Sequence, residues 1–234
     1  MQLSERLSLV AGFVTEGYRL ADIGTDHGYI PIELVKKGTV PSAIAMDINS
    51  GPLDRAYENV QINGLSGKIE TRLSDGLCNL NPGEADSVVI AGMGGALTVK
   101  ILEEGKNVLN SVKEIILSPH TEIFLVRKYL IDNMYEIVRE EMVCDMGKFY
   151  TVMRAVHTKD KSIKGEYEKD KNSYIYGKLL LEEKSPVFLE YLSYESRKQA
   201  DILKNMENAT GKNKKKEEIK EKIDYIENIL HPEG

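Results

Sequence analysis

The sequence predicts an α/β fold: a mostly parallel sheet with helices on both faces, closed by an antiparallel hairpin and followed by a C-terminal α-helical appendage. Three observations predict it. Short apolar runs alternate with amphipathic stretches up to residue 133, and strands that alternate with helices form parallel sheets through right-handed crossovers. Two strand-like runs then follow across only D-M-G-K, a link that permits only a hairpin. Beyond Thr158 the strand pattern stops.

Each element follows from a local pattern. The spacing of Leu3, Leu7, Val10 and Val14 predicts an amphipathic opening helix. Apolar runs predict five buried strands, at residues 19–23, 42–47, 69–73, 86–90 and 114–118. Helices are expected at residues 31–37, 52–63, after the A-G-M-G-G loop to about 105, and at 122–133. The hairpin strands are expected at 135–144 and 149–156, which makes seven strands in all.

The C-terminal part predicts two antiparallel helices. Residues 158–234 hold 32 charged residues among 77, against 36 among 157 before them, so we predict a first domain over 1–157 and a charged helical hairpin domain over 158–234. Apolar residues between 187 and 206 lie near one stripe, and Ile219, Ile223, Ile226 and Leu230 keep a 4-3-4 spacing. A short link, A-T-G-K-N-K, suggests a coiled-coil-like hairpin that could bind a partner or mediate dimerisation.

Composition narrows the class of protein. The chain has 234 residues, is 41% hydrophobic and carries a net charge of −6. Its longest apolar runs fall short of the roughly 20 residues that span a bilayer, and its N-terminus lacks the pattern of a signal peptide. Cys78 and Cys144 lie far apart and form no metal-ligand cluster. We expect a reduced, cytoplasmic protein without a metal site. An acidic total does not favour nucleic-acid binding, although local patches decide that question.

The loop A-D-I-G-T-D-H-G-Y, after the first strand, predicts a cofactor site. NAD-binding turns use G-x-G-x-x-G to approach a pyrophosphate, whereas here Gly24 and Gly28 are four residues apart and Asp26 replaces the second glycine. Asp26 and Asp22 would repel a pyrophosphate but suit a cation. S-adenosylmethionine carries a sulfonium and an ammonium and no phosphate, so the loop favours this cofactor over NAD. An ordinary strand-to-helix turn is the alternative.

Acidic residues also follow the next two strands. Asp47 ends the second strand and could accept two ribose hydroxyl groups, or could cap a helix. Asp75, in S-D-G, could accept from an adenine amino group, or could form a simple turn. Because ligands bind at the carboxyl edge of open α/β sheets, these acids and Asp22 are expected to meet there.

The fourth strand ends in A-G-M-G-G, whose glycines let a large flat group approach the backbone, or serve helix packing. Enzymes that methylate exocyclic amines commonly carry an Asn/Asp-Pro-Pro-aromatic motif here. Its absence favours a ring nitrogen such as adenine N1.

Together, A-D-I-G-T-D-H-G-Y, A-M-D-I-N, S-D-G-L, A-G-M-G-G, S-P-H and G-K-F-Y resemble the bacterial tRNA (adenine-22-N1)-methyltransferase family (TrmK) over about residues 1–157. The resemblance implies a class I methyltransferase with a Rossmann-like seven-stranded sheet. It implies S-adenosyl-L-methionine as cofactor and tRNA as substrate, methylated at N1 of an adenine in the D arm. The residues it would place around the cofactor are Asp22, Gly24, Gly28, Asp47, Asn49, Asp75, Gly76 and Gly92.

The same resemblance places Asp26, His27 and Tyr29 against the methyl group and the target base. A carboxylate such as Asp26 would stabilise the positive charge that methylation puts on adenine. His27 could accept a proton from N6 or orient the base. The plainer interpretation has Asp26 as a helix cap and His27 as a loop residue. His120, after the fifth strand, could line the same cleft.

Aromatic and basic residues could hold the RNA. A flipped adenine needs an apolar face, and the candidates are Tyr29, Met93, Phe149 and Tyr150. Phosphates need basic clusters, and one lies at the helical turn: Lys212, Lys214, Lys215 and Lys216. A solvated helix tip explains these lysines equally well. A second patch could come from Arg6, Arg19, Lys36, Lys37, Arg127 and Lys128.

Three functions compete. The first is a tRNA adenine-N1 methyltransferase, and the second is a methyltransferase for a small molecule or a protein. The third is a non-catalytic scaffold whose helical hairpin binds a partner, although a scaffold needs none of the three strand-end acids. A nicotinamide oxidoreductase is disfavoured by the missing G-x-G-x-x-G. The oligomeric state stays open.

Overall fold

The computed structural model describes residues 3–206 and 213–232. The chain forms two compact units, Met1–Glu182 and Glu183–Gly234. This division falls later than the boundary that the charge pattern predicts after residue 157. Residues 158–182 therefore share a compact unit with the sheet.

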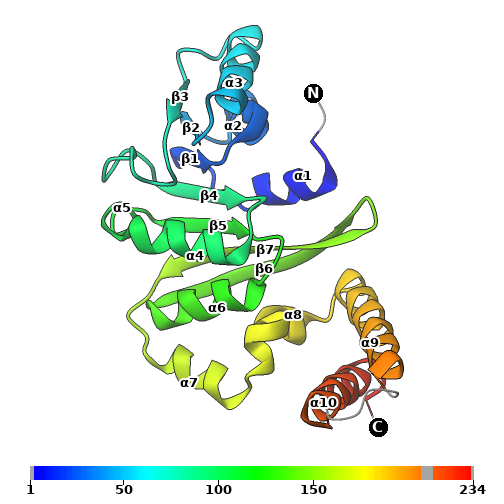
Figure 1. The fold of residues 1–234 in the computed structure, drawn as a ribbon. Coiled ribbons are helices and arrows are strands. Elements are labelled where there is room, and N and C mark those ends of the chain that lie inside the picture. The colour runs from blue at the N-terminus through cyan, green and yellow to red at the C-terminus, as the bar shows by residue number, and fades with distance from the viewer. Residues whose placement is uncertain (1–2, 207–212, 233–234) are drawn as a thin grey trace. The chain divides into compact units, whose positions relative to one another are not determined.

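One seven-stranded sheet forms the centre of the first unit. Its strands are β1 (Leu20–Ile23), β2 (Ala43–Asp47), β3 (Ile69–Leu73), β4 (Ser87–Ala91), β5 (Glu114–Ser118), β6 (Tyr135–Asp145) and β7 (Lys148–His157). They lie in the order β3-β2-β1-β4-β5-β7-β6 (Figure 1). The first five run parallel to one another, while β7 is antiparallel to both β5 and β6. The predicted α/β fold with a closing antiparallel hairpin is confirmed.

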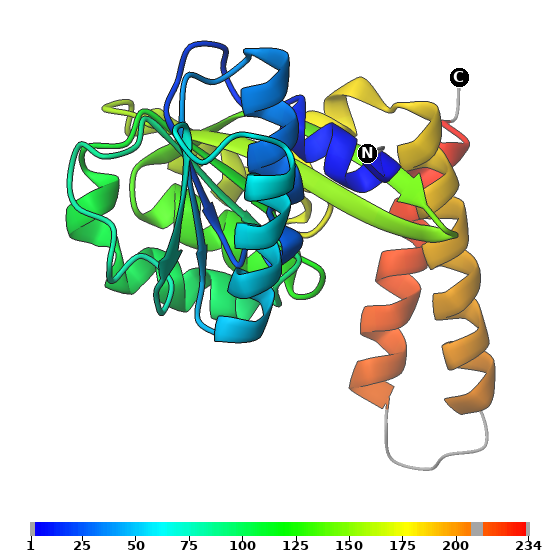
Figure 2. The ribbon, with the colours of Figure 1, turned by 90° about the horizontal axis from the view of Figure 1, so that it is seen from above.

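Helices cover both faces of this sheet (Figure 2). The helices packed on one face are α1 (Glu5–Ala11), α2 (Tyr29–Lys37) and α3 (Ser50–Ile62). Those on the other face are α4 (Gly95–Glu104), α5 (Lys106–Leu109) and α6 (Ile123–Asp132). Strands β1 and β5 are buried over their full lengths, because a parallel strand between two helical layers meets apolar side chains on both sides. This explains why the sequence shows them as continuous apolar runs.

The β6–β7 hairpin turns tightly at Met146 and Gly147. Both residues have positive φ angles, 50° and 75°, as a two-residue turn of type I′ requires. A register shift between Ile137 and Arg139 adds a bulge near the far end of the hairpin. The turn brings Asp145 within hydrogen-bond distance of α1, where its Oδ2 accepts from the backbone N–H of Arg6 at 3.1 Å.

Residues 158–182 are fastened to the sheet unit by a buried arginine. They form α7 (Ser162–Lys169), the π-helical turn η2 (Ser173–Gly177) and most of α8 (Lys178–Glu183). Arg127 of α6 is 1% exposed and donates from Nε to Glu140 Oε1 at 2.7 Å. Its Nη1 donates to the carbonyl groups of Tyr174 and Ile175 at 2.9 and 2.7 Å. The prediction that Arg127 belongs to a surface patch for RNA is therefore wrong, because its guanidinium is buried and paired with Glu140.

The second unit contains the two predicted C-terminal helices, α9 (Pro186–Met206) and α10 (Asn213–Leu230), which lie side by side (Figure 2). Leu192 of α9 and Ile226 of α10 are fully buried, and Ser196 of α9 donates to Glu227 Oε1 of α10 at 2.6 Å. Lys214 and Lys215 are exposed at the start of α10. Lys212 lies outside the described residues.

Candidate active site

A pocket of about 350 Å³ opens at the carboxyl edge of the sheet, beside the ends of β1 and β4. Five of the predicted site residues line it: Asp22, Gly24, Asp26, Tyr29 and Gly92. The other lining residues are Arg6, Leu7, Thr25, Ile30, Ala91 and His120. Helices α1 and α2, strands β1 and β4 and the loops after β1, β4 and β5 thus meet at one cavity, as expected at the strand ends of an open α/β sheet.

Asp22 supplies a buried negative charge to this pocket. It is 3% exposed, and its Oδ2 accepts a hydrogen bond from Thr25 Oγ1 at 2.6 Å. The pKa of Asp22 is raised to about 6, chiefly by burial and to a smaller extent by the charge of Asp47, while the Thr25 hydrogen bond lowers it. Two acids held this close, one of them poorly solvated, favour a cationic ligand that would stabilise both charges.

Asp47, the last residue of β2, is also buried, and its Oδ1 accepts from the backbone N–H of Asn49 at 2.8 Å. Asn49 directly precedes α3, so this contact fixes the turn between strand and helix. This is a turn contact and not a helix cap, because Asn49 is the N-cap of α3 and α3 has no side-chain cap hydrogen bond. The turn contact and the predicted ribose contact are compatible, since a carboxylate has two oxygens with about four acceptor sites.

The loop between β1 and α2 has a constrained backbone. Gly24 and Gly28 have φ angles of 73° and 70°, and the non-glycine residues Asp26 and His27 also have positive angles, 27° and 33°. Such conformations are costly and concentrate at functional sites. The backbone N–H groups of Gly24 and Thr25 both donate to the carbonyl of Met46, at 2.8 and 2.9 Å. These bonds tie the loop to the end of β2.

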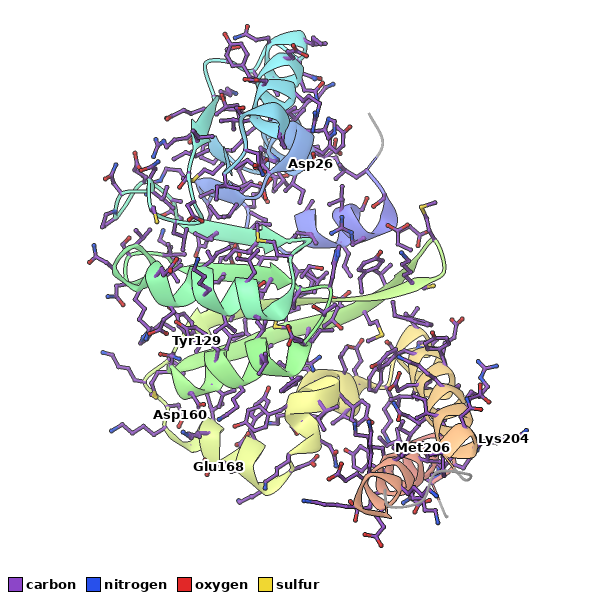
Figure 3. The ribbon with its side chains drawn as sticks, in the orientation of Figure 1. Asp26, Tyr129, Asp160, Glu168, Lys204 and Met206 are labelled. Atoms are coloured by element: carbon purple, nitrogen blue, oxygen red, sulfur yellow. The ribbon has the colours of Figure 1, made fainter. Side chains whose placement is uncertain are left out.

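This loop presents Asp26 to solvent and stacks His27 on Tyr29. The Asp26 side chain, labelled in Figure 3, is 70% exposed, and its Oδ1 lies 3.4 Å from His27 Nε2. The rings of His27 and Tyr29 lie 5.1 Å apart and nearly parallel. Neither the short turn Asp26–Gly28 nor α2 has a side-chain cap among the described residues, so the helix-cap interpretation of Asp26 is wrong. The loop leaves its carboxylate available to a ligand.

Gly28 has a packing role. A Cβ atom at this position would lie 3.3 Å from the Cβ of Ala56 in α3. His27 is held from the same side, because its carbonyl accepts from Asn59 Nδ2 at 2.9 Å. Helix α3 therefore supports the turn that carries Asp26, His27 and Tyr29.

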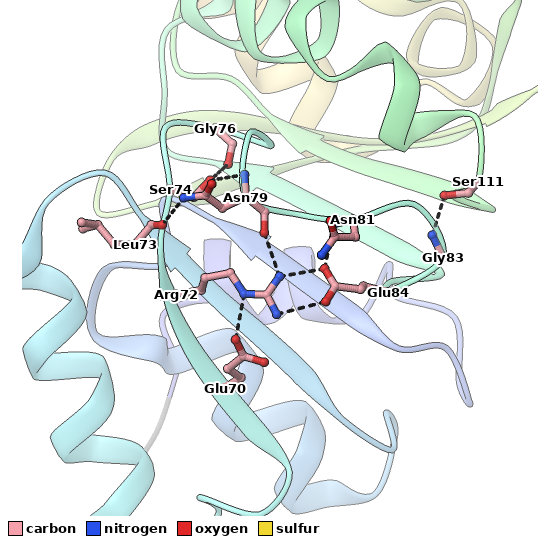
Figure 4. A network of polar contacts seen from close by, with 10 residues as sticks. All are labelled: Glu70, Arg72, Leu73, Ser74, Gly76, Asn79, Asn81, Gly83, Glu84 and Ser111. Atoms are coloured by element: carbon pink, nitrogen blue, oxygen red, sulfur yellow. Dashed lines mark hydrogen bonds and ion pairs between the residues drawn. The ribbon is translucent and has the colours of Figure 1, made fainter.

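The loop after β3 is a network of short polar contacts (Figure 4). Ser74 Oγ donates to the carbonyl of Gly76 at 2.9 Å and accepts from the backbone N–H of Asn79 at 3.1 Å. The Ser74 backbone N–H donates to the carbonyl of Asp47 at 2.8 Å, which joins this loop to the end of β2. Asp75 is exposed on this loop, and neither it nor Gly76 lines the pocket. Their predicted contacts to an adenine stay a prediction.

The glycines after β4 differ in their roles. Gly92 lines the pocket with a φ angle of 85°. A Cβ on Gly95 would lie 2.5 Å from the carbonyl oxygen of Glu122, so Gly95 serves close packing. Met93 reaches back across the site, since its Cε stands 2.3 Å from where a Gly24 Cβ would be. The packing interpretation of A-G-M-G-G therefore holds at Gly95, while the approach of a flat group at Gly92 stays a prediction.

The sequence did not predict Arg6 at the pocket, and it indicated His120 only as a residue that could line the same cleft. Arg6 belongs to α1, far away in sequence, and no local motif marks it. The imidazole of His120 lies 5.2 Å from the ring of Tyr150. Partial burial and the positive charges of Arg6 and Lys148 hold the pKa of His120 below its ordinary value. This side of the pocket is therefore electropositive, whereas the side of Asp22 and Asp26 is acidic.

Among the described residues, every helix is too short or too polar to span a membrane. No cluster of three or more His, Cys, Asp or Glu side chains in residues 3–206 and 213–232 could hold a metal ion.

Known proteins resemble this chain along most of its length. A Bacillus subtilis (strain 168) tRNA (adenine(22)-N(1))-methyltransferase is 34% identical over 227 residues, 97% of this chain and 95% of that protein. The crystal structure of the B. subtilis m1A22 tRNA methyltransferase TrmK matches with a TM-score of 0.87 and 32% identity, over 98% of this chain and 99% of that one. That of Streptococcus pneumoniae Sp1610 in complex with S-adenosyl-L-methionine matches with a TM-score of 0.87 and 35% identity, over 98% and 100%.

The family model described as tRNA (adenine(22)-N(1))-methyltransferase matches residues 20–228, from the first strand of the sheet into the last helix. The sheet order, the acidic strand ends and the carboxyl-edge pocket agree with this match. The chain belongs to the TrmK family of tRNA (adenine(22)-N(1))-methyltransferases.

Proposed function

We propose that this protein transfers a methyl group from S-adenosyl-L-methionine to N1 of adenine 22 in the D arm of tRNA. The observation that carries the proposal is the acidic wall of the pocket in a chain that aligns over nearly its whole length with a relative of that activity. A tRNA substrate would place the protein in the cytoplasm.

The residues present fit the cofactor. The buried carboxylate of Asp22 raises the free energy of the empty site, since burial and the charge of Asp47 both disfavour its ionisation. A ligand with a sulfonium and an ammonium group relieves that cost, and the ribose hydroxyl groups supply donors that the acids can accept. Asp22, Gly24 and Gly92 would hold the cofactor in the pocket, with Asp47 and Asn49 at the end of β2 and Asp75 and Gly76 at the end of β3. When bound, S-adenosylmethionine supplies a methyl carbon whose bond to sulfur breaks as its bond to adenine N1 forms.

Asp26 would act on the target base. Methylation of N1 leaves the adenine positively charged, and the carboxylate of Asp26 stands at the pocket with most of its surface free. A fixed negative charge stabilises such a developing cation without reorganising in the reaction. His27 and Tyr29 form a stacked aromatic pair beside it, and we assign to them the orientation of the base.

The test is tritium transfer from labelled S-adenosylmethionine to an unmodified tRNA that has adenine at position 22, with the same tRNA carrying guanine there as control. We expect label in the first reaction only, at N1. Intact cofactor binding with no label in either tRNA would leave a small-molecule or protein methyltransferase, or a scaffold, in place of this proposal.

The role of Asp26 needs a matched pair of variants. We expect Asp26→Asn to lower kcat about 100- to 1,000-fold, as loss of an electrostatic stabiliser does, with unchanged cofactor affinity. Asp160→Asn is the control, because Asp160 is exposed, lies beyond the end of β7 (Figure 3) and keeps its turn contact to Ser162 as asparagine. Equal activity of the two variants would remove Asp26 from the reaction.

A further inference from the structure

Arg6 brings to the pocket a positive charge that acts through space on the carboxylate of Asp145 but forms no ion pair with it. It lines the cavity beside Gly92 and His120. Its Nη1 atom is buried and has no hydrogen-bond partner among residues 3–206 and 213–232. It lies 3.7 Å from the place that a Cβ on Gly92 would take. A buried guanidinium N–H without a hydrogen-bond acceptor costs free energy, so we expect a ligand to supply an acceptor at this position.

Other contacts fix the Arg6 side chain without using its charge in an ion pair. The backbone N–H of Arg6, and not its guanidinium, donates to Asp145 Oδ2. The guanidinium lies over the ring of Tyr150, with Cζ 5.4 Å from the ring centroid. Both anchors come from the β6–β7 hairpin. A side chain held in this way loses little further freedom when it binds a ligand.

The acceptor that fits is an anion, and the charge pattern of the pocket indicates which one. Asp22 and Asp26 make one wall acidic, and a cationic cofactor suits that wall. Arg6 and the nearby Lys148 make a second side of the pocket, which also holds His120, electropositive. A nucleotide brought to this second side carries one fixed anion beside its base, the phosphate. Arginine binds phosphate oxygens through parallel N–H donors.

We propose that Arg6 binds a phosphate next to the target adenosine and thereby positions the base in the pocket. The proposal rests on the proposed function, because it takes tRNA as the substrate. The carboxylate of S-adenosylmethionine is the other anion that could reach a guanidinium here, and the test separates the two sources.

The first arm measures kinetics and cofactor binding of Arg6→Ala and Arg6→Lys. We expect Arg6→Ala to raise the KM for tRNA about 10- to 100-fold, the range for a lost hydrogen bond to a charged group, with kcat within about threefold. We expect Arg6→Lys to recover part of the loss, since lysine keeps the charge but not the paired donors. Calorimetric titration with S-adenosylmethionine should give the same Kd for all three proteins.

Arg19→Ala is the matched control. Arg19, a candidate for the same basic patch, directly precedes β1 at the opposite edge of the sheet, where its Nε donates to Asp86 Oδ2 at 2.8 Å. Because its charge is paired with Asp86 away from the pocket, we leave Arg19 out of that patch. The loss of Arg19 should leave both the KM for tRNA and cofactor binding unchanged. Equal thermal unfolding of the variants and the wild type excludes a folding defect in Arg6→Ala.

The second arm removes the charge from the RNA. Two tRNAs carry one neutral methylphosphonate each, on the 5′ or the 3′ side of adenosine 22, with a 2′-O-methyl group that keeps the linkage stable. Control tRNAs carry the 2′-O-methyl group with a normal phosphate. We expect one of the two methylphosphonates to lower the kcat/KM of the wild type about 10- to 100-fold. The same methylphosphonate should not lower the kcat/KM of Arg6→Ala any further, because the contact between Arg6 and the phosphate is already lost in that variant.

Each other outcome is decisive. If each methylphosphonate lowers the kcat/KM of Arg6→Ala by the same factor as that of the wild type, Arg6 binds neither phosphate and the inference is wrong. If Arg6→Ala weakens S-adenosylmethionine instead, the anion is the carboxylate of the cofactor, and the inference is also wrong. Normal tRNA methylation by Arg6→Ala removes this inference alone, whereas no methylation of any tRNA by the wild type removes the proposed function and this inference together.

Discussion

Replacing Asp22 by asparagine should stabilise the protein while it destroys the site. In the folded protein the pKa of Asp22 is raised from 3.8 to about 6. Each tenfold change in an acidity constant corresponds to about 1.4 kcal/mol, so keeping this carboxylate ionised costs on the order of 3 kcal/mol at pH 8. Asparagine carries no charge, and its Oδ1 can still accept from Thr25 Oγ1. We expect Asp22→Asn to unfold with a free energy higher by up to about 3 kcal/mol at pH 8.

The pH dependence of this difference in unfolding free energy follows from the direction of the pKa shift. Because burial raises the pKa of Asp22, its contribution to stability is fully present below about pH 4 and is lost as the pH rises through about 6. The advantage of Asp22→Asn should therefore be small, about 0.5 kcal/mol, at pH 4 and grow to its full value by pH 7. Cofactor affinity should move oppositely in the wild type, strengthening between pH 5 and pH 7 as Asp22 ionises.

Urea unfolding followed by circular dichroism at pH 4, 5, 6, 7 and 8 measures both proteins without cofactor. Calorimetry at pH 7 measures S-adenosylmethionine binding, which we expect the variant to lose. An advantage of equal size at every pH would refute the reasoning, since it would not come from relief of the buried charge. No advantage at pH 8 would refute the raised pKa itself. The expected result is a stabilised, inactive protein, the trade-off of a strained functional site.

Three further predictions concern the scaffold, and urea unfolding measures each. Glu140→Leu should lower the free energy of unfolding by about 3–5 kcal/mol, because it leaves Arg127 buried without its carboxylate, and adding Arg127→Leu should recover part of the loss; a double variant less stable than the single one would contradict this. Met146→Asn should add about 0.5–1 kcal/mol, because asparagine suits the left-handed turn position that Met146 holds at 97% exposure, and no gain would show that the turn is unstrained. Gly95→Ala should cost several kcal/mol, of order 2–4, because its Cβ would press on the carbonyl of Glu122, and a neutral change would show that this loop yields freely.

The acids of the site were predictable because they occupy strand ends. In a parallel sheet every strand presents its carboxyl end at the same edge, so Asp22 and Asp47 could be placed together without coordinates. The family resemblance, and not this logic, predicted Asp26 and Tyr29 at the site, and the loop after β1 brings both to the pocket. The identities of these residues, acidic instead of glycine, already favoured a cationic cofactor.

Arg6 and Arg127 could not be separated from the sequence alone. Both are arginines in short amphipathic helices, and both were candidates for the same basic patch. The fold buries Arg127 against Glu140, where its guanidinium also donates to the carbonyl of Tyr174 and so holds residues 158–182 to the sheet. It leaves the guanidinium of Arg6 at the pocket with one nitrogen unpaired among the described residues. The charge of a side chain is local information, whereas its partner comes from an element far away in the chain.

By itself, the sequence determined the α/β class, the closing hairpin, the acidic loops and the two C-terminal helices, because periodicity and turn chemistry act over a few residues. Only the tertiary structure decided which side chains are buried, which glycines serve packing and which line the pocket, and where the first compact unit ends. These depend on contacts between residues such as Gly95 and Glu122, or Arg6 and Tyr150, which chain closure brings together. Burial then sets the pKa of Asp22 and the unpaired state of Arg6 Nη1, the two properties on which the chemistry of the pocket depends.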